Sequence, residues 1–304
     1  EDELSVNLTV LPLQDAKEVT LGTMIMMEDI SSEKRVKSTM ARYMDPELAD
    51  QLVGGGEEVL GGQGKEATVL FSDVRGFTTL TEELGAQGTV RLLNEYFTVM
   101  VDCIQAEGGM LDKFIGDAIM AIFGTPFSHE DDEDRGLRCA CDMMAQLAKF
   151  NADRAAKNLL PIDMGIGLNT DYVVSGNIGS PKRMDYTVIG DGVNLAARLE
   201  SACKQYGAKL LMSEYTYKSL KATYRTRHVD KVIVKGKTEP VGVFEVLDFM
   251  TEEEFPNMIE CLGNFNDGVS YYQKAEWDKA IDKFKEALKL NPEDVCSNMY
   301  VERC

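Results

Sequence analysis

Between residues 67 and 247 the pattern of apolar positions alternates between short runs typical of strands and a spacing of three to four residues typical of helices. Short runs rich in branched and aromatic residues predict strands at 67–72, 110–114, 118–123, 162–168, 173–178, 185–189, 229–235 and 241–247. Apolar residues three and four apart, as at Val90, Leu93 and Phe97, predict helices at 87–106, 133–150, 192–206 and 213–220. This βαββαβ order with antiparallel hairpins predicts an α+β domain whose helices cover one face of a sheet.

Two further β-rich runs precede this domain, at residues 4–13 and 20–30. Two strands do not make a stable domain alone, and their shape resembles the last hairpin of a PAS sensor domain. We therefore expect residues 1–32 to be the C-terminal remnant of a PAS-like domain, with a hairpin packed directly on the core as the alternative. Residues 33–64 combine apolar positions at spacing four with a Gly-rich end, which predicts a helical signalling connector and linker, or else a surface helix.

The C-terminal residues 258–304 contain two helical stretches with small and aromatic positions such as Gly268, Tyr272, Trp277 and Phe284. They resemble a single tetratricopeptide repeat, a helix pair that needs a neighbour to cover its apolar face. An ordinary helical hairpin is the alternative.

Composition narrows the classes of function. No apolar run is long enough to span a bilayer, which predicts a soluble chain. Seven cysteines at irregular spacings favour buried thiols in a reducing, cytoplasmic compartment over disulfides. The net charge of −19 argues against a nucleic-acid partner. The region 65–250 is the least acidic for its length, so a polyanionic ligand would be least hindered there.

Two acidic residues stand in segments suited to metal chemistry. The segment FSDVRGFT places Asp73 at the end of a predicted strand, and DKFIGDAIMAIFG places Asp117 in the tight turn of a predicted hairpin. Hard divalent cations choose carboxylate oxygens, and two shared aspartates could bridge a pair of Mg²⁺ ions. Either residue alone would be weak support, because Gly-Asp is common in hairpin turns for conformational reasons.

The segment YTVIGDGVNLAARLE predicts a strand, a turn and the start of a helix. Asn194 and Arg198 lie four residues apart on that helix, so they share a face. Leu195 and Leu199 form the adjoining apolar stripe. The polar pair is therefore expected to point away from its own core.

Taken together, these motifs closely resemble class III nucleotidyl cyclases over residues 65–248, and we assign the catalytic domain to 65–250. The resemblance implies a ferredoxin-like α+β catalytic domain. It implies that Asp73 and Asp117 bind metal, and that Lys113 and Thr187 read the purine. It further implies that Asn194 and Arg198 orient the ribose and stabilise the transition state. Lys235 in VKGKTEP would contact the triphosphate, with Lys237 as the alternative.

The implied reaction makes physical sense of these residue types. Attack of the ribose 3′-oxygen on the α-phosphorus of ATP, with pyrophosphate leaving, needs positioning and charge neutralisation. Two Mg²⁺ ions per site, or Mn²⁺ in their place, would supply much of that charge. The Arg198 guanidinium stays protonated and can face the charge on the α-phosphoryl group.

The choice of base follows from donors and acceptors. Lys113 only donates, which suits N1 of adenine and clashes with N1–H of guanine. Thr187 can accept from the adenine amine but could equally donate. A threonine at this position resembles the class IIIb, bicarbonate-responsive cyclases, which makes bicarbonate or calcium candidate regulators. A guanylyl cyclase and a catalytically silent nucleotide-binding regulatory domain remain the alternatives.

In the family each active site is shared between two catalytic domains. One domain gives the two aspartates, and the other gives the purine-reading, Asn, Arg and triphosphate-binding residues. Both sets are present in this chain, which contains one catalytic domain. The resemblance therefore implies a homodimer with two equivalent sites.

Overall fold

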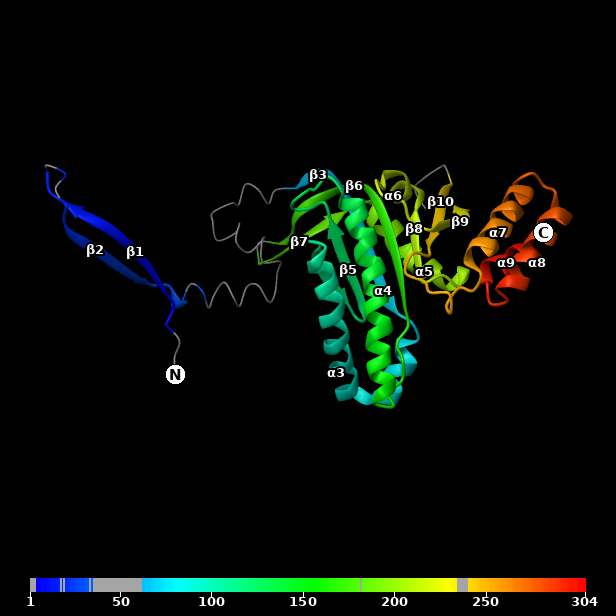
Figure 1. The fold of residues 1–304 in the computed structure, drawn as a ribbon, viewed down its shortest axis with the longest axis horizontal. Coiled ribbons are helices and arrows are strands. Elements are labelled where there is room, and N and C mark those ends of the chain that lie inside the picture. Colours follow the sequence, from blue (N-terminus) through cyan, green and yellow to red (C-terminus); the bar gives the residue numbers. More distant parts are fainter. Residues whose placement is uncertain are drawn as a thin grey trace. The chain divides into compact units, whose positions relative to one another are not determined.

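The computed structural model describes residues 4–16, 18, 20–32, 34, 62–180, 182–233 and 240–304. The chain divides into two compact units, Glu1–Leu60 and Gly61–Cys304, which Figure 1 shows as ribbons. Each unit is described by itself. The predicted triphosphate-binding Lys235 and Lys237 lie outside the described residues, as does most of the predicted connector and linker 33–64.

The first unit contains one antiparallel hairpin. Strands β1 (Val6–Gln14) and β2 (Thr20–Asp29) pair with Val6 opposite Asp29, and the Ser31 hydroxyl accepts a hydrogen bond from the Ser5 backbone N–H at 2.8 Å. Apolar side chains on both strands are exposed within this unit. The two predicted β-rich runs are thus present, and their PAS-like origin stays a prediction.

The second unit is built on an eight-stranded mixed sheet. Its strands are β3 (Gln63–Val74), β4 (Met110–Ile115), β5 (Ala118–Phe123), β6 (Met164–Ser180), β7 (Arg183–Ile189), β8 (Leu210–Ser213), β9 (Thr226–Val232) and β10 (Val241–Val246). They follow the order β4-β5-β3-β6-β8-β10-β9, and β7 pairs with β6. Only the pairing of β6 with β8 is parallel among these described strands. The α+β class predicted from the sequence is confirmed.

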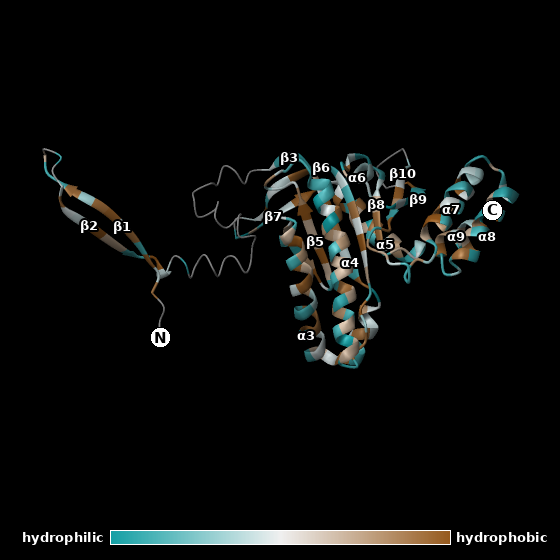
Figure 2. Cartoon of the chain, in the orientation of Figure 1, coloured by the Kyte–Doolittle hydropathy of each residue, from teal (hydrophilic) through white to brown (hydrophobic). Residues whose placement is uncertain are grey.

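Two long helices cover one face of this sheet. Helices α3 (Phe77–Ala106) and α4 (Asp132–Ala156) lie side by side in Figure 1, and their apolar stripes bury Tyr96, Met100 and Leu137 against Leu70 of β3. Each fully buried side chain of this kind stabilises the fold by about 1.5–3 kcal/mol. Figure 2 shows strand β5, which lies between β4 and β3, as hydrophobic along its length, as expected for a strand packed on both faces.

Helix α5 (Asp191–Tyr206) lies on the opposite face, so the expectation that all helices share one face is wrong. Only α3 and α4, of these three helices, share one face of the sheet. Gly167 of β6 has no side chain, and a Cβ there would collide with the Ala196 carbonyl oxygen of α5. This close approach lets Ala196 pack with Val69 and Val188 on the second face.

Strand β6 is one long strand where the sequence predicts two, 162–168 and 173–178. Two of the residues between the predicted strands, Asn169 and Thr170, are buried and form hydrogen bonds inside the protein. Asn169 donates to the Gly192 carbonyl at 2.9 Å, and the Thr170 hydroxyl lies 2.8 Å from the Thr68 hydroxyl. Buried polar groups with partners do not interrupt a strand. The short strand β8 was not predicted.

The C-terminal segment forms three helices where two were expected. Helices α7 (Met258–Gln273), α8 (Trp277–Leu290) and α9 (Val295–Arg303) join the core of α5, β9 and β10. The short helix α6 (Glu214–Ser219) contacts β6, β8 and β10. The Phe284 and Tyr300 rings stack at 4.9 Å between centroids. The apolar faces of α7, α8 and α9 are therefore covered by α5 and the sheet of the same unit.

Arg227 fixes these helices to the sheet through a buried ion network. Its Nε donates to Glu245 at 2.6 Å, and its two terminal nitrogens donate to both carboxylate oxygens of Asp294 at 3.0 and 2.8 Å. Burial alone would raise the pKa of Asp294, but the Arg227 guanidinium holds it below its usual value. Within the described ranges, no helix combines the length and apolar character that crossing a membrane requires.

We predict that Arg227→Ala lowers the free energy of unfolding by about 3–5 kcal/mol, because Glu245 and Asp294 would remain buried without a counter-charge. Arg225→Ala is the matched control, since Arg225 forms an exposed ion pair with Asp248 and should cost about 1 kcal/mol or less. Urea denaturation measures both values. Equal losses in the two variants would contradict the account.

Candidate active site

Asp73 and Asp117 are brought together by strand register. Ser72 of β3 lies opposite Ile119 of β5, so the next residue, Asp73, reaches the turn that joins β4 to β5. That turn contains Gly116, whose φ of 67° favours glycine, and Asp117. Burial and the neighbouring charge of Asp73 raise the pKa of Asp117 to about 6. Two carboxylates that repel each other in this way fit a divalent cation, which would neutralise both.

Lys113 and Thr187 meet at a third residue that the sequence analysis did not single out, Asp112. The Thr187 hydroxyl donates to Asp112 Oδ2 at 3.0 Å, and Lys113 Nζ lies 3.4 Å from the same oxygen. The Asp112 side chain has no exposed surface, while 41% of the Lys113 side chain is exposed. The structure therefore joins the two predicted purine-reading residues in one cluster, in which the Lys113 side chain is partly exposed.

A β-bulge explains the position of Asp112. Leu111 pairs with Ala121 and Lys113 pairs with Met120, so Asp112 is the extra residue on β4. A bulge redirects a side chain that regular alternation would send elsewhere. Burial raises the pKa of Asp112, while the Thr187 hydrogen bond and the Lys113 charge oppose that rise. The sequence alone could not predict this role of Asp112, because an acidic residue next to a lysine indicates neither the bulge nor the contact with Thr187.

Asn194 and Arg198 occupy the exposed face of α5. Leu195 and Leu199 on the same helix are buried at 1% and 2% exposure, so the polar pair points away from the core, as its spacing predicts. In the described part of the chain, no side chain forms a hydrogen bond or an ion pair with Asn194 or Arg198. Both side chains are exposed and can therefore reach a ligand.

The candidate site residues therefore form three groups on one chain. These are the acidic pair Asp73 and Asp117, the cluster of Lys113, Asp112 and Thr187, and the helix pair Asn194 and Arg198. Among the residues that the structure describes, no hydrogen bond or ion pair links one group to another. The chemistry available is cation binding, recognition of a base with hydrogen-bonding edges, and charge neutralisation by a guanidinium.

Comparison with known proteins identifies the family. The family model described as "Adenylate and Guanylate cyclase catalytic domain" matches residues 62–248. The chain belongs to this family. It is 39% identical over 196 residues to an adenylate cyclase of Anabaena cylindrica, covering 62% of this chain and 38% of that protein. The chain spans less than half of the length of the curated relatives it matches first.

Two solved structures share the fold. The adenylyl cyclase CyaB from P. aeruginosa aligns with a TM-score of 0.58 and 37% identity, covering 62% of this chain and 97% of that one. The guanylyl cyclase Cya2 aligns with a TM-score of 0.57 and 37% identity, covering 65% of this chain and 98% of that one. Because an adenylyl and a guanylyl cyclase match equally well, the comparisons leave the base to be argued from the site.

If the acidic pair binds a divalent cation, either Asp73→Ala or Asp117→Ala should weaken Mn²⁺ binding by about 10- to 100-fold. Asp278→Ala, which removes one acidic side chain from helix α8, is the control for loss of charge. Electron paramagnetic resonance of free Mn²⁺ measures the affinity without relying on turnover. Unchanged affinity in both aspartate variants would exclude this cation site.

Proposed function

We propose that this chain is an adenylyl cyclase that converts ATP to 3′,5′-cyclic AMP and pyrophosphate in signal transduction. One observation carries the choice of ATP: Asp112 holds Lys113 and Thr187 in a single cluster, with the Lys113 side chain partly exposed. A lysine can donate to N1 of adenine, whereas N1 of guanine carries a proton and cannot accept. Guanylyl cyclase activity is the second candidate, favoured by the equal match to a guanylyl cyclase structure.

In the proposed reaction the ribose 3′-oxygen forms a bond to the α-phosphorus, the bond to the pyrophosphate oxygen breaks, and the 3′-hydroxyl loses its proton. Asn194 would orient the ribose, because its amide both donates and accepts. Arg198 would face the α-phosphoryl group, where its fixed positive charge stabilises the negative charge of the transition state. Lys235 or Lys237 would contact the β- and γ-phosphates.

Asp73 and Asp117 would hold Mg²⁺, for which their oxygen donors and close approach are suited. When bound there, Mg²⁺ would lower the pKa of the 3′-hydroxyl and neutralise phosphate charge. Each position in these motifs carries a chemically competent side chain, which favours turnover over a silent nucleotide-binding domain.

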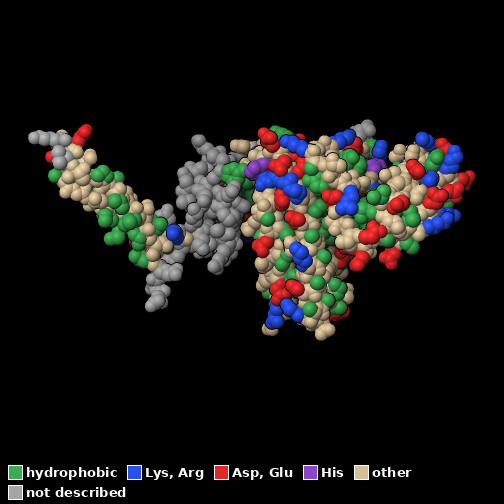
Figure 3. Space-filling view, in the orientation of Figure 1, with side chains coloured by type: hydrophobic (Ala, Val, Ile, Leu, Met, Phe, Trp, Pro, Cys, Tyr) green, Lys and Arg blue, Asp and Glu red, His purple; other side chains and the backbone are tan. Residues whose placement is uncertain are grey.

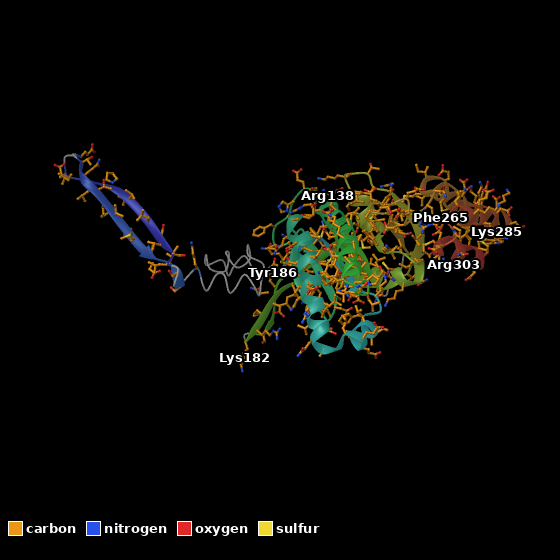
Figure 4. The ribbon with its side chains drawn as sticks, turned by 60° about the horizontal axis from the view of Figure 1, so that its bottom comes forward. Arg138, Lys182, Tyr186, Phe265, Lys285 and Arg303 are labelled. Atoms are coloured by element: carbon orange, nitrogen blue, oxygen red, sulfur yellow. The ribbon has the colours of Figure 1, made fainter. Side chains whose placement is uncertain are left out.

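A homodimer is the proposed assembly, with each active site formed by residues of both chains. Both sets of site residues lie in one chain, and among those that the structure describes no hydrogen bond or ion pair links one group to another. Exposed apolar side chains gather on the elements that carry these groups: Phe114 and Ile115 beside the β4–β5 turn, and Val174, Met184 and Ile189 on the β6–β7 hairpin. Figure 4 shows this hairpin projecting from the sheet with Lys182 at its tip. Exposed apolar surface of this kind is suited to contact a second copy.

Thr187 also supports assignment to class IIIb, and with it regulation by bicarbonate or calcium. A threonine side chain is neutral and cannot balance the positive charge of Lys113. The negative charge beside Lys113 comes from Asp112, to which Thr187 donates a hydrogen bond. The proposed role of the C-terminal helices is to cover the second sheet face of the catalytic unit.

The purified chain with Mg²⁺ or Mn²⁺ should form cyclic AMP from ATP and little cyclic GMP from GTP, measured by chromatography of the products. Lys113→Glu should lower kcat/KM for ATP by about 100-fold and remove the preference for ATP, because glutamate accepts where adenine N1 needs a donor. Lys285→Glu on α8, the same charge reversal away from the site, should change neither value. A preference for ATP that survives Lys113→Glu would overturn this account of base selection.

A further inference from the structure

We propose that Asp112 is a specificity-determining positioning residue: it orients the Thr187 hydroxyl so that this hydroxyl can only accept a hydrogen bond from the base. The inference rests on the proposed function. It adds a residue that acts on substrate choice through another side chain.

The geometry of Asp112 is unusual for a purely structural residue. Its carboxylate is completely buried at a bulge of β4, and Oδ2 accepts from Thr187 at 3.0 Å and lies 3.4 Å from Lys113 Nζ. Oδ1 is also buried, and no described residue donates a hydrogen bond to it. Burying a carboxylate oxygen without a donor costs stability. An apolar residue would fill this position better if packing were its only task.

The direction of the hydrogen bond decides what Thr187 offers to a ligand. A hydroxyl has one proton, and an ionised carboxylate can only accept. The Thr187 proton is therefore committed to Asp112, which leaves only lone pairs on the hydroxyl oxygen for the base. Thr187 is 8% exposed, so few other partners can compete for that oxygen.

This polarity matches one class of purine. The 6-amino group of adenine donates, so it complements the oriented Thr187 oxygen. The 6-oxo group of guanine or hypoxanthine accepts, so two acceptors would face each other without a proton between them, which costs affinity. Asp112 also lies against Lys113, the donor for N1. One buried carboxylate thus sets both the donor and the acceptor that a 6-aminopurine requires.

The test compares kcat/KM for ATP with kcat/KM for inosine triphosphate, which carries a 6-oxo group but lacks the 2-amino group of GTP. In Asp112→Leu the Thr187 proton is released and can be donated to the 6-oxo group. The ATP-to-ITP preference should then fall about tenfold or more. In Asp112→Asn the amide oxygen can still accept from Thr187, so the preference should stay within about threefold of the unmodified protein.

Asp185→Asn is the matched control. Asp185 is an exposed acidic residue two positions before Thr187 on β7, and it forms no hydrogen bond with the threonine. Burial raises the pKa of Asp112 and the charge of Asp185 contributes to that rise, but substitution of Asp185 leaves the hydrogen bond between Asp112 and Thr187 in place and should leave the preference unchanged. If Asp112→Leu does not fold, Thr187→Val replaces it, and this variant should also lose about tenfold of the preference because the acceptor is gone.

The results separate the two proposals. No cyclic nucleotide from the unmodified protein would refute the proposed function, and the same preference would then be measured as the ratio of Kd values for ATP and ITP. A folded Asp112→Leu or Thr187→Val variant that keeps the original ratio, in turnover or in binding, would overturn the role of Asp112. A loss in Asp112→Asn as large as in Asp112→Leu would overturn it as well.

Discussion

The antiparallel pairing of β3 with β5 and β6 is the constraint on which the candidate site depends. Its register places Asp73 beside the turn that carries Asp117. The hairpin of β5 with β4 carries the bulge at Asp112, and the hairpin of β6 with β7 carries Thr187. A one-residue slip would send the side chains of β3 to the wrong faces, so the same pairing that builds the core also positions the chemistry.

Much of the site could be predicted because short motifs encode local geometry. A Gly-Asp turn between strands exposes a carboxylate, and spacing of four puts Asn194 and Arg198 on one helix face. The features of the site and fold that the sequence did not predict depend on contacts between segments that are distant in the chain. Asp112 differs from an ordinary surface acid only through a bulge and a partner 75 positions away in the chain. The placement of α5 depends on Gly167 of β6, because a Cβ at this position would collide with the backbone of α5.

The buried carboxylates of Asp294 and Asp112 differ in how completely their oxygens are hydrogen-bonded. Asp294 has both oxygens bonded to Arg227, which joins the C-terminal helices to the sheet. Asp112 has one oxygen bonded and one without a described donor. The paired network suits a structural role, whereas the incomplete one suits recognition. On the face that Figure 3 shows, acidic and basic side chains of the second unit are interspersed.

We propose that two copies of the chain complete each active site, with the acidic pair of one chain facing the nucleotide whose base and ribose are held by the other. Mixing Asp117→Ala chains with Arg198→Ala chains tests this most directly, because each variant alone should be inactive. Isolated heterodimers should regain cyclic AMP formation, up to about half of the unmodified rate, since one of two equivalent sites would be intact. Heterodimers that form and bind nucleotide but remain inactive would contradict the shared site.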